Sequence, residues 1–300
     1  MRIHIVGKGA IGLLIAKDLQ LSNAECQLMV RDISTSPITV TDLMAKDWAI
    51  SATQITVEQQ EKADHSADIL LLPVKTFQVL EALKQWRACI GKDTLIVILC
   101  NGIGVESAVV DMFPDNAIAR GITNRAALKK SEQHVIEKGL GETFLGWLQP
   151  GKNKEESEQL ISNIFPGITW QNSVLETLWK KVAINAIINP LTAIKDIPNG
   201  SLSEPRFQPI ITELLTEIAS LFLAKSISLS KTDLTNIIAK VITNTADNYS
   251  SMHQDIAQHK RTEIDYITGQ LLLEAKKHGV LMPRNQDLYQ QVKSLETRVF

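Results

Sequence analysis

The first third of the chain alternates between short apolar runs and stretches with helical spacing. The runs are residues 1–6, 26–30, 68–74 and 94–100. The third run, DILLLPV, is continuously apolar after Asp68, as expected of a parallel strand buried on both faces. Between the runs, apolar side chains recur at helical spacing, as at Leu14, Ile15 and Leu19. This alternation predicts an α/β fold with a parallel sheet.

The pattern changes in the second half of the chain. Further strands are expected at residues 117–121, 134–137, 143–147 and 168–171. After Asn172 every long segment has helical spacing, and we expect helices at residues 174–189, 205–226, 232–258, 262–278 and 285–298. The chain therefore divides, by prediction, into an α/β domain at 1–172 and an all-helical domain at 173–300.

A GxGxxG sequence follows the first strand directly and opens a helix. In such a loop the first glycine allows a tight turn, the second lets backbone approach a pyrophosphate, and the third lets helix pack on strand. The N–H groups of the helix N-terminus then suit phosphate. A glycine-rich turn of purely structural use is the alternative. The expected cofactor-binding residues here are Gly7, Lys8, Gly9, Ala10, Ile11 and Gly12.

Three polar side chains follow the predicted strands at their carboxyl ends, the edge where open α/β sheets bind ligands. Arg31 favours the 2'-phosphate of NADP, although Asp32 beside it keeps NAD open. Lys75 is a candidate cofactor or substrate contact, or else an exposed loop lysine. Asn101 could hold the nicotinamide or a substrate oxygen, or else serve a turn before glycine.

A polar stripe runs along an otherwise apolar helix in the second half. Lys181, Asn185 and Asn189 recur at i, i+4 and i+8, on one helical face. Buried polar groups need hydrogen-bond partners, and a bound small molecule would supply them. The alternative is that Lys181 reaches solvent and the asparagines bond to nearby backbone. Pro190 predicts that this helix ends or kinks at Asn189.

Composition narrows the class of partner. A net charge of −2, a pI near 6.3 and 44% hydrophobic residues describe a globular protein with no broad electrostatic reason to bind nucleic acid or anionic membrane. The odd number of cysteines (Cys26, Cys89 and Cys100) predicts reduced thiols of a cytoplasmic protein. No signal peptide, membrane span or metal site is expected from the sequence.

Two further groups of polar residues lie in the helical half. Asn248, Ser251 and Asp255 are spaced to share one helical face, which by itself is typical of a solvated surface. Thr262 and Glu263 precede an apolar helical stretch, where they would ordinarily serve helix-start chemistry.

Taken in order, these stretches resemble the ketopantoate reductase (2-dehydropantoate 2-reductase) family along essentially the whole chain. The resemblance rests on GxGxxG with the later Arg31, the NGIG turn at 101–104, LWKKVAINAIINPLTA with its PNG sequel at 198–200, SSMHQD at 250–255, and RTEIDYITG at 261–269. It implies a Rossmann-type dinucleotide-binding domain followed by an all-helical domain like that of 6-phosphogluconate dehydrogenase.

The resemblance also implies roles for particular residues. Lys181 would be the catalytic lysine, and Glu263 a glutamate beside the substrate and the cofactor. Substrate contacts would come from Asn101, Asn185, Asn189, Asn248 and Ser251, and cofactor contacts from Arg31, Lys75 and Asn101 as well as the glycine loop. Two residues depart from the family pattern: Lys8 replaces a small uncharged residue, and Thr268 stands where asparagine is common.

The expected activity is NADPH-dependent reduction of 2-dehydropantoate to (R)-pantoate in pantothenate biosynthesis. Two alternatives stay open: a paralogous reductase of another 2-oxo acid, and an NADP-sensing protein without chemistry. The expected partner is a small 2-keto acid, and the sequence leaves a homodimer open.

Overall fold

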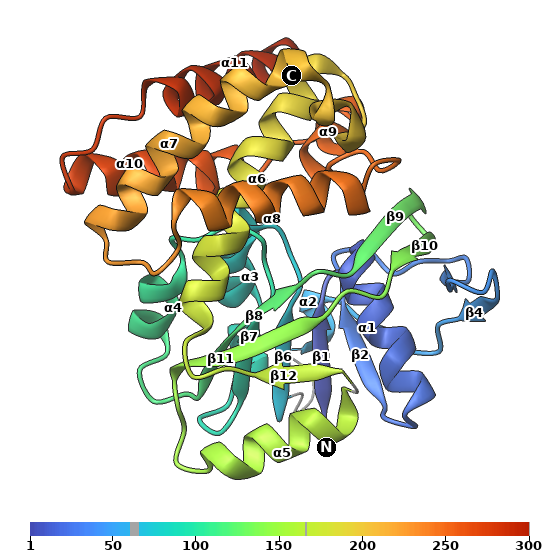
Figure 1. Ribbon diagram of the computed structural model, residues 1–300. Coiled ribbons are helices and arrows are strands. Elements are labelled where there is room, and N and C mark those ends of the chain that lie inside the picture. Colours follow the sequence, from blue (N-terminus) through green and yellow to red (C-terminus); the bar gives the residue numbers. More distant parts are fainter. Residues whose placement is uncertain (61–65, 166, 300) are drawn as a thin grey trace. The chain divides into compact units, whose positions relative to one another are not determined.

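The computed structural model describes residues 1–60, 66–165 and 167–299, and the chain forms two compact units (Figure 1). The first comprises Met1–Cys100 and Val105–Leu175. The second comprises Glu176–Phe300 together with the short segment Asn101–Gly104. Each unit is described by itself.

An eight-stranded sheet forms the centre of the first unit. Its strands, in spatial order, are β12 (Ile168–Trp170), β11 (Thr143–Gln149), β8 (Ile118–Thr123), β7 (Leu95–Ile98), β6 (Ile69–Leu72), β1 (Ile3–Val6), β2 (Cys26–Met29) and β5 (Thr53–Ile55). All neighbours are parallel except β11 and β8. The chain leaves β1 toward β2 and returns on its other side through β6. This reversal is the switch point at which open α/β sheets bind ligands.

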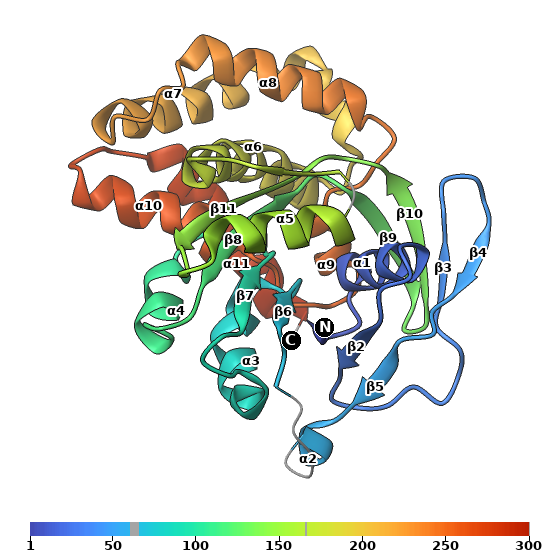
Figure 2. The same ribbon diagram turned by 90° about the horizontal axis from the view of Figure 1, so that it is seen from below.

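Helices cover both faces of this sheet. Figure 2 shows α1 (Ala10–Leu21) and α5 (Lys154–Ile164) on one face, with α3 (Val79–Gln85) and α4 (Glu106–Met112) on the other. Right-handed crossovers require this arrangement, because the chain moves in opposite directions from β1 to β2 and from β6 to β8. Leu13 and Leu19 of α1 are fully buried in the core with Ile5 of β1. The fold class predicted from the apolar runs is confirmed. Short helices complete the unit: α2 (Val57–Gln60), η1 (Thr76–Gln78) and η2 (Arg87–Cys89).

A second, four-stranded sheet packs on α1. Its order is β4 (Asp47–Ala49), β3 (Thr39–Thr41), β10 (His134–Gly139) and β9 (Ala126–Ser131). Val40 and Val135 are fully buried in the same core as α1. The sequence patterns predicted neither β9 nor β5, because both are short strands with mixed polarity. These segments become strands through their hydrogen bonds to neighbouring strands, β9 to β10 and β5 to β2.

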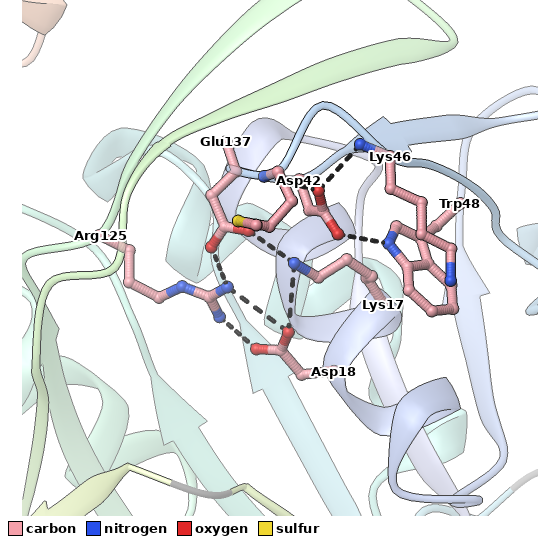
Figure 3. Close-up of polar contacts among 8 residues, drawn as sticks. Lys17, Asp18, Asp42, Lys46, Trp48, Arg125 and Glu137 are labelled. Atoms are coloured by element: carbon pink, nitrogen blue, oxygen red, sulfur yellow. Dashed lines mark hydrogen bonds and ion pairs between the residues drawn. The ribbon is translucent and has the colours of Figure 1, made fainter.

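Four charged side chains connect α1 to the β9–β10 hairpin (Figure 3). Glu137 receives hydrogen bonds from Lys17 Nζ and from Arg125 Nη2, each at 2.6 Å. Asp18 pairs with Arg125 and lies 3.7 Å from Lys17 Nζ. The side chains of Glu137 and Lys17 are only 1% and 7% exposed. We call these four residues the ion quartet.

The second unit is helical. Its helices are α6 (Val174–Lys195), η3 (Asn199–Ser203), η4 (Pro205–Phe207), α7 (Gln208–Ala224), α8 (Lys231–Asn244), α9 (Ser251–Ala257), η5 (Ile264–Tyr266), α10 (Thr268–Lys277) and α11 (Pro283–Val299). Helix α7 contacts α8, α10 and α11 and buries Leu214, Ile218 and Phe222.

One helical segment of the described chain, Pro205–Ala224, is long and apolar enough to cross a membrane by length and composition. It includes α7, whose Leu214, Ile218 and Leu221 are fully buried among the other helices. Because the core helix of a soluble protein has the same properties, this segment is weak support for a membrane span.

Helix α6 does not end at Asn189, which was one of the two outcomes expected from Pro190; it continues to Lys195. Proline removes one backbone hydrogen bond and disfavours the helix interior by about 3 kcal/mol. On both sides of it the helix is packed in the core: Ile187, Ile188 and Leu191 are at most 3% exposed. This burial outweighs the local preference.

The helix predicted at 232–258 is wrong, because residues 245–250 separate α8 from α9. The N–H groups of Asn199 and Gly200 bond to the carbonyls of Asn248 and Ala246, so these carbonyls do not continue a helix. Ser250 then caps α9, its Oγ accepting the His253 N–H at 3.1 Å. Asn248 therefore lies outside the helix that it was predicted to share with Ser251.

Candidate active site

The glycine loop has the geometry that a pyrophosphate requires. Gly7 adopts φ +83°, a conformation that side chains disfavour. A Cβ on Gly12 would lie 3.2 Å from Pro73 and 3.3 Å from Ile5, so the third glycine allows the close packing of α1 on the sheet. Gly9 precedes α1 and has no side chain to cap it. The first-turn N–H groups are thus available to an anion, and the loop fits a dinucleotide.

Two cations lie where the adenosine ribose of a Rossmann-bound dinucleotide is expected. Arg31 is exposed in the bend after β2. The Nζ of Lys8 reaches from the glycine loop to the same segment, donating to Ser34 Oγ at 2.8 Å and to the carbonyl of Asp32 at 3.2 Å. The unusual lysine of the loop is therefore held beside the segment that carries Arg31.

Lys75 lies at the carboxyl end of β6, next to β1 in the sheet. Its neighbours contact the glycine loop, since the Cβ position of Gly7 is 3.7 Å from Val74 and that of Gly9 is 3.7 Å from the Pro73 carbonyl. Lys75 is half-buried and precedes η1. Within the first unit, the structure thus groups Lys75 with the glycine loop.

The polar stripe of α6 lies at the border of a buried face. Val182, Ala183, Ala186 and Ile187 are fully buried. Asn189 is 6% exposed, while Lys181 and Asn185 are half-buried. The helix thus places an ammonium and two carboxamides in a row beside an apolar surface, where hydrogen bonds and charge act more strongly than in water.

A chain of hydrogen bonds connects α6 to the start of α9. Thr192 Oγ1 lies 2.8 Å from Ser250 Oγ, and both side chains are buried. Asn199 Nδ2 donates to Thr245 Oγ1 at 2.9 Å, and the Asn199 N–H bonds to the Asn248 carbonyl at 2.9 Å. The PNG sequence therefore holds the segment 245–250, which carries Asn248 and leads into Ser251.

The second unit also brings the Asn101 loop against the turn that carries Glu263. The N–H of Ile103 bonds to the carbonyl of Tyr266 at 2.9 Å, and the Tyr266 N–H bonds to the Glu263 carbonyl at 2.9 Å. Glu263 is 3% exposed. The helical spacing predicted a helix from residue 262, but Glu263 lies outside any helix, directly before η5. Asn101 is half-buried.

Glu296, which the sequence did not indicate, holds this turn in place. Thr262 donates to Glu296 Oε1 through its N–H at 2.8 Å and through its hydroxyl at 2.7 Å. Glu296 pairs in turn with Lys293 at 2.7 Å. Nothing in the polar pattern of α11 distinguishes Glu296 from its exposed neighbours, so only the fold identifies it. Ser250, which caps α9, was also missed, although the sequence carried a signal for it: serine is preferred at the start of a helix.

These features define a class of protein: a Rossmann-type, dinucleotide-binding α/β unit joined to a helical unit that presents a lysine, amides and a buried glutamate. Comparison with known proteins identifies the family. The family model described as "Ketopantoate reductase PanE/ApbA" matches residues 3–150. The model described as "Ketopantoate reductase PanE/ApbA C terminal" matches residues 173–296.

Curated relatives match the chain over nearly its full length. The 2-dehydropantoate 2-reductase of Vibrio cholerae serotype O1 is 34% identical over 297 residues, which covers 99% of this chain and 98% of the relative. That of Escherichia coli O157:H7 is 32% identical over 302 residues, covering 99% and 96%. The chain belongs to the ketopantoate reductase family. Both of these relatives are oxidoreductases.

Solved structures share the fold. A D-mandelate dehydrogenase in ternary complex with NADH and anilino(oxo)acetate superposes with a TM-score of 0.90 at 25% identity, covering 100% of this chain and 99% of that one. A ketopantoate reductase from Ralstonia eutropha JMP134 superposes with a TM-score of 0.86 at 23% identity, with the same coverage.

Proposed function

We propose that this protein reduces 2-dehydropantoate to (R)-pantoate with NADPH, in pantothenate biosynthesis. The domain at 1–172 would bind the dinucleotide, and the domain at 173–300 would bind the keto acid. The observation that carries the proposal is the stripe of α6, in which half-buried Lys181 lies in line with two carboxamides. The near-full-length relatives named 2-dehydropantoate 2-reductase support the choice of substrate.

In this mechanism the nicotinamide, when bound, supplies a hydride to C2 of the keto acid. Negative charge then develops on the carbonyl oxygen, and Lys181 Nζ, as an ammonium, stabilises this charge and donates the proton that completes the alcohol. The low polarity around α6 strengthens the effect of that charge. Lys181 is the only cation of the stripe.

The other polar groups bind and orient the substrate. Asn185, Asn189, Asn248 and Ser251 would hold its carboxylate and hydroxyl oxygens. Glu263 would accept a hydrogen bond from the substrate hydroxyl or orient Lys181, and it would also contact the cofactor. Asn101 shares the second unit with Glu263, and its amide suits either the nicotinamide carboxamide or a substrate oxygen.

Replacement of Lys181 tests the assignment, and Lys180 provides a matched control on the same helix. Lys181→Ala should lower kcat by about 10² to 10⁴, the range for loss of a positioned general acid, and leave the Kd of NADPH nearly unchanged. Lys180→Ala should retain kcat within about twofold, because Lys180, although also half-buried, lies off the face that carries Lys181, Asn185 and Asn189. A Lys181→Ala enzyme with normal kcat would exclude this role and make Lys75 the leading candidate. Glu263→Ala should chiefly raise the KM of the keto acid.

The preference for NADPH over NADH is also a proposal, supported by the two cations near the end of β2. Arg31 is exposed there, and Lys8 is held beside it by Ser34. Arg31→Ala should raise the KM for NADPH far more than that for NADH, while Lys130→Ala, at an exposed lysine on β9, should alter neither. Equal effects of Arg31→Ala on both cofactors would show that Arg31 does not meet the 2'-phosphate.

A second candidate function is reduction of a different 2-oxo acid, favoured by the TM-score of 0.90 with a D-mandelate dehydrogenase. NADPH oxidation, followed by absorbance with a panel of 2-keto acids, separates the two. Faster turnover of an aromatic 2-keto acid than of 2-dehydropantoate would favour the second. Tight NADPH binding without turnover of any of them would favour an NADP-sensing role.

We also propose a cytoplasmic location, supported by the three cysteines, which are all free thiols. Burial raises the pKa of Cys26 and Cys89 to about 11, so these two are unreactive at neutral pH. A homodimer stays a proposal, and sedimentation velocity at micromolar concentration would test it.

A further inference from the structure

The sheet of the first unit is incompletely covered on the face that carries α1 and α5. Helix α1 covers β1 and β2, and α5 packs on β12 at the other end of the sheet. Between these helices, side chains of β6, β7 and β11 (Leu71, Val97 and Leu145) form the floor of a cavity of about 450 Å³. The cavity thus occupies the place where another helix would complete the layer.

The wall of this cavity is largely apolar. Ile15 of α1 and Ile161 of α5 line its sides, and Phe165 lies at the end of α5. The volume, about 450 Å³, is roughly three times that of an engineered 150 Å³ cavity that binds benzene, and it lies within the range of natural ligand pockets. Water bound against the apolar part of this wall would lack the two to four polar partners that ordered water needs. An apolar molecule is the occupant that suits the surface.

Charged side chains in the lining restrict the ligand further. All four members of the ion quartet border the cavity: Lys17, Asp18, Arg125 and Glu137. They pair with one another, two cations with two anions, so the charged part of the lining is neutral overall and its charges are compensated (Figure 3). A charged ligand would lose hydration without gaining an uncompensated counter-charge. Two apolar side chains at the mouth, Leu21 and Leu140, are 49% and 73% exposed.

We propose that this cavity is a binding site for an uncharged, aromatic or branched-aliphatic small molecule, distinct from the phosphate-binding backbone of the glycine loop. The two sites adjoin at the first turn of α1, because Ile11 also lines the cavity. Helix α1 connects the two sites. Its N-terminus follows the glycine loop, whereas Ser22, just past its last residue, borders the cavity mouth. At about 1.5 Å per residue these ends are roughly 18 Å apart. Ser22 is exposed, so it can be changed without disturbing the core.

Two fluorescent probes that differ by one charged group test the site. N-Phenyl-1-naphthylamine is uncharged, and 8-anilinonaphthalene-1-sulfonate is the same skeleton with a sulfonate. We expect saturable binding of the uncharged probe at one per chain, at least about tenfold tighter than that of the sulfonate, because burial of an unpaired charge is unfavourable. Binding should persist at saturating NADPH. Equal affinity for both probes, no saturable binding, or displacement by NADPH would overturn the proposal.

Three variants localise the probe. Ser22→Trp should block the mouth and Val97→Phe should fill the floor, and each should weaken binding of the uncharged probe at least about tenfold. Ser131→Trp, at an exposed serine that does not border the cavity, should bind it like the wild type. Circular dichroism confirms folding of each variant. Unchanged binding in folded Ser22→Trp would overturn the proposal, even if Val97→Phe failed to fold. No turnover is measured, so the result is independent of the keto-acid reductase activity.

Discussion

Two buried threonines in the second unit provide a controlled comparison of a satisfied and an unsatisfied hydroxyl. Thr262 and Thr268 are 1% and 0% exposed and lie six positions apart on either side of η5. Thr262 Oγ1 donates to Glu296 Oε1 at 2.7 Å and accepts from the Ile264 N–H at 3.2 Å. Thr268 Oγ1 has no hydrogen-bond partner among the described residues. The same substitution, threonine to valine, should therefore have different effects at the two positions.

The magnitudes follow from these contacts. Valine at 262 preserves the volume but removes a hydrogen bond to a carboxylate, worth about 1.5 to 3 kcal/mol, and leaves the Ile264 N–H without its acceptor. Glu296 keeps its bonds to the Thr262 N–H and to Lys293. We expect Thr262→Val to lower the free energy of unfolding by about 2 to 3 kcal/mol. Thr268→Val removes only a desolvated hydroxyl, and should leave stability unchanged or raise it by up to about 1 kcal/mol.

Urea unfolding followed by far-UV circular dichroism measures both changes, read from the midpoints at equal m-values. The turn that Thr262 anchors also holds Glu263. Thr262→Val should therefore raise the KM of the keto acid, and Thr268→Val should leave it unchanged. Equal destabilisation by the two substitutions would refute the reasoning, because it would mean that the hydroxyl of Thr268 is satisfied or that the loss at Thr262 is not a hydrogen-bond effect.

Two further predictions concern the ion quartet and the PNG segment. Burial raises the pKa of Glu137, but hydrogen bonds from its arginine and lysine partners outweigh it, and the folded pKa is below the ordinary 4.5. The stability that Glu137 contributes is therefore present above pH 4.5 and is lost as the pH falls through its folded pKa. Above pH 5, the free energy of unfolding of Glu137→Gln should be lower than that of the wild type by a constant amount, about 3 to 5 kcal/mol. Below pH 4.5 this difference should become smaller. A difference that does not change with pH would contradict this prediction. In the PNG segment, a Cβ on Gly200 would lie 2.8 to 2.9 Å from three atoms of Ala246, so Gly200→Ala should lower stability by about 1 to 3 kcal/mol and raise the keto-acid KM. The same change at Gly91, whose nearest contact is 3.7 Å, should be tolerated, and equal losses in urea unfolding would exclude the clash as the cause.

The sequence by itself determined the features that depend on neighbouring residues. The apolar runs located β1, β6 and β7 to within two residues at each end, and GxGxxG identified the loop between β1 and α1. The carboxyl ends of these strands indicated Arg31 and Lys75, since parallel strands end at one edge. The spacing along α6 placed Lys181, Asn185 and Asn189 on one face, because a helix fixes that geometry without any partner.

Tertiary structure decided the features in which distant residues compete with local preference. Helix α6 passes through Pro190 because its core packing outweighs the proline, and the segment after α8 leaves the helix because its carbonyls bond to Asn199 and Gly200. Glu137 and Lys17, separated by 120 positions, form a buried ion pair that no local pattern indicates. The cavity between α1 and α5 depends on which strands are adjacent. Such features arise from contacts between segments far apart in the chain, whose energies are set only when the fold brings them together.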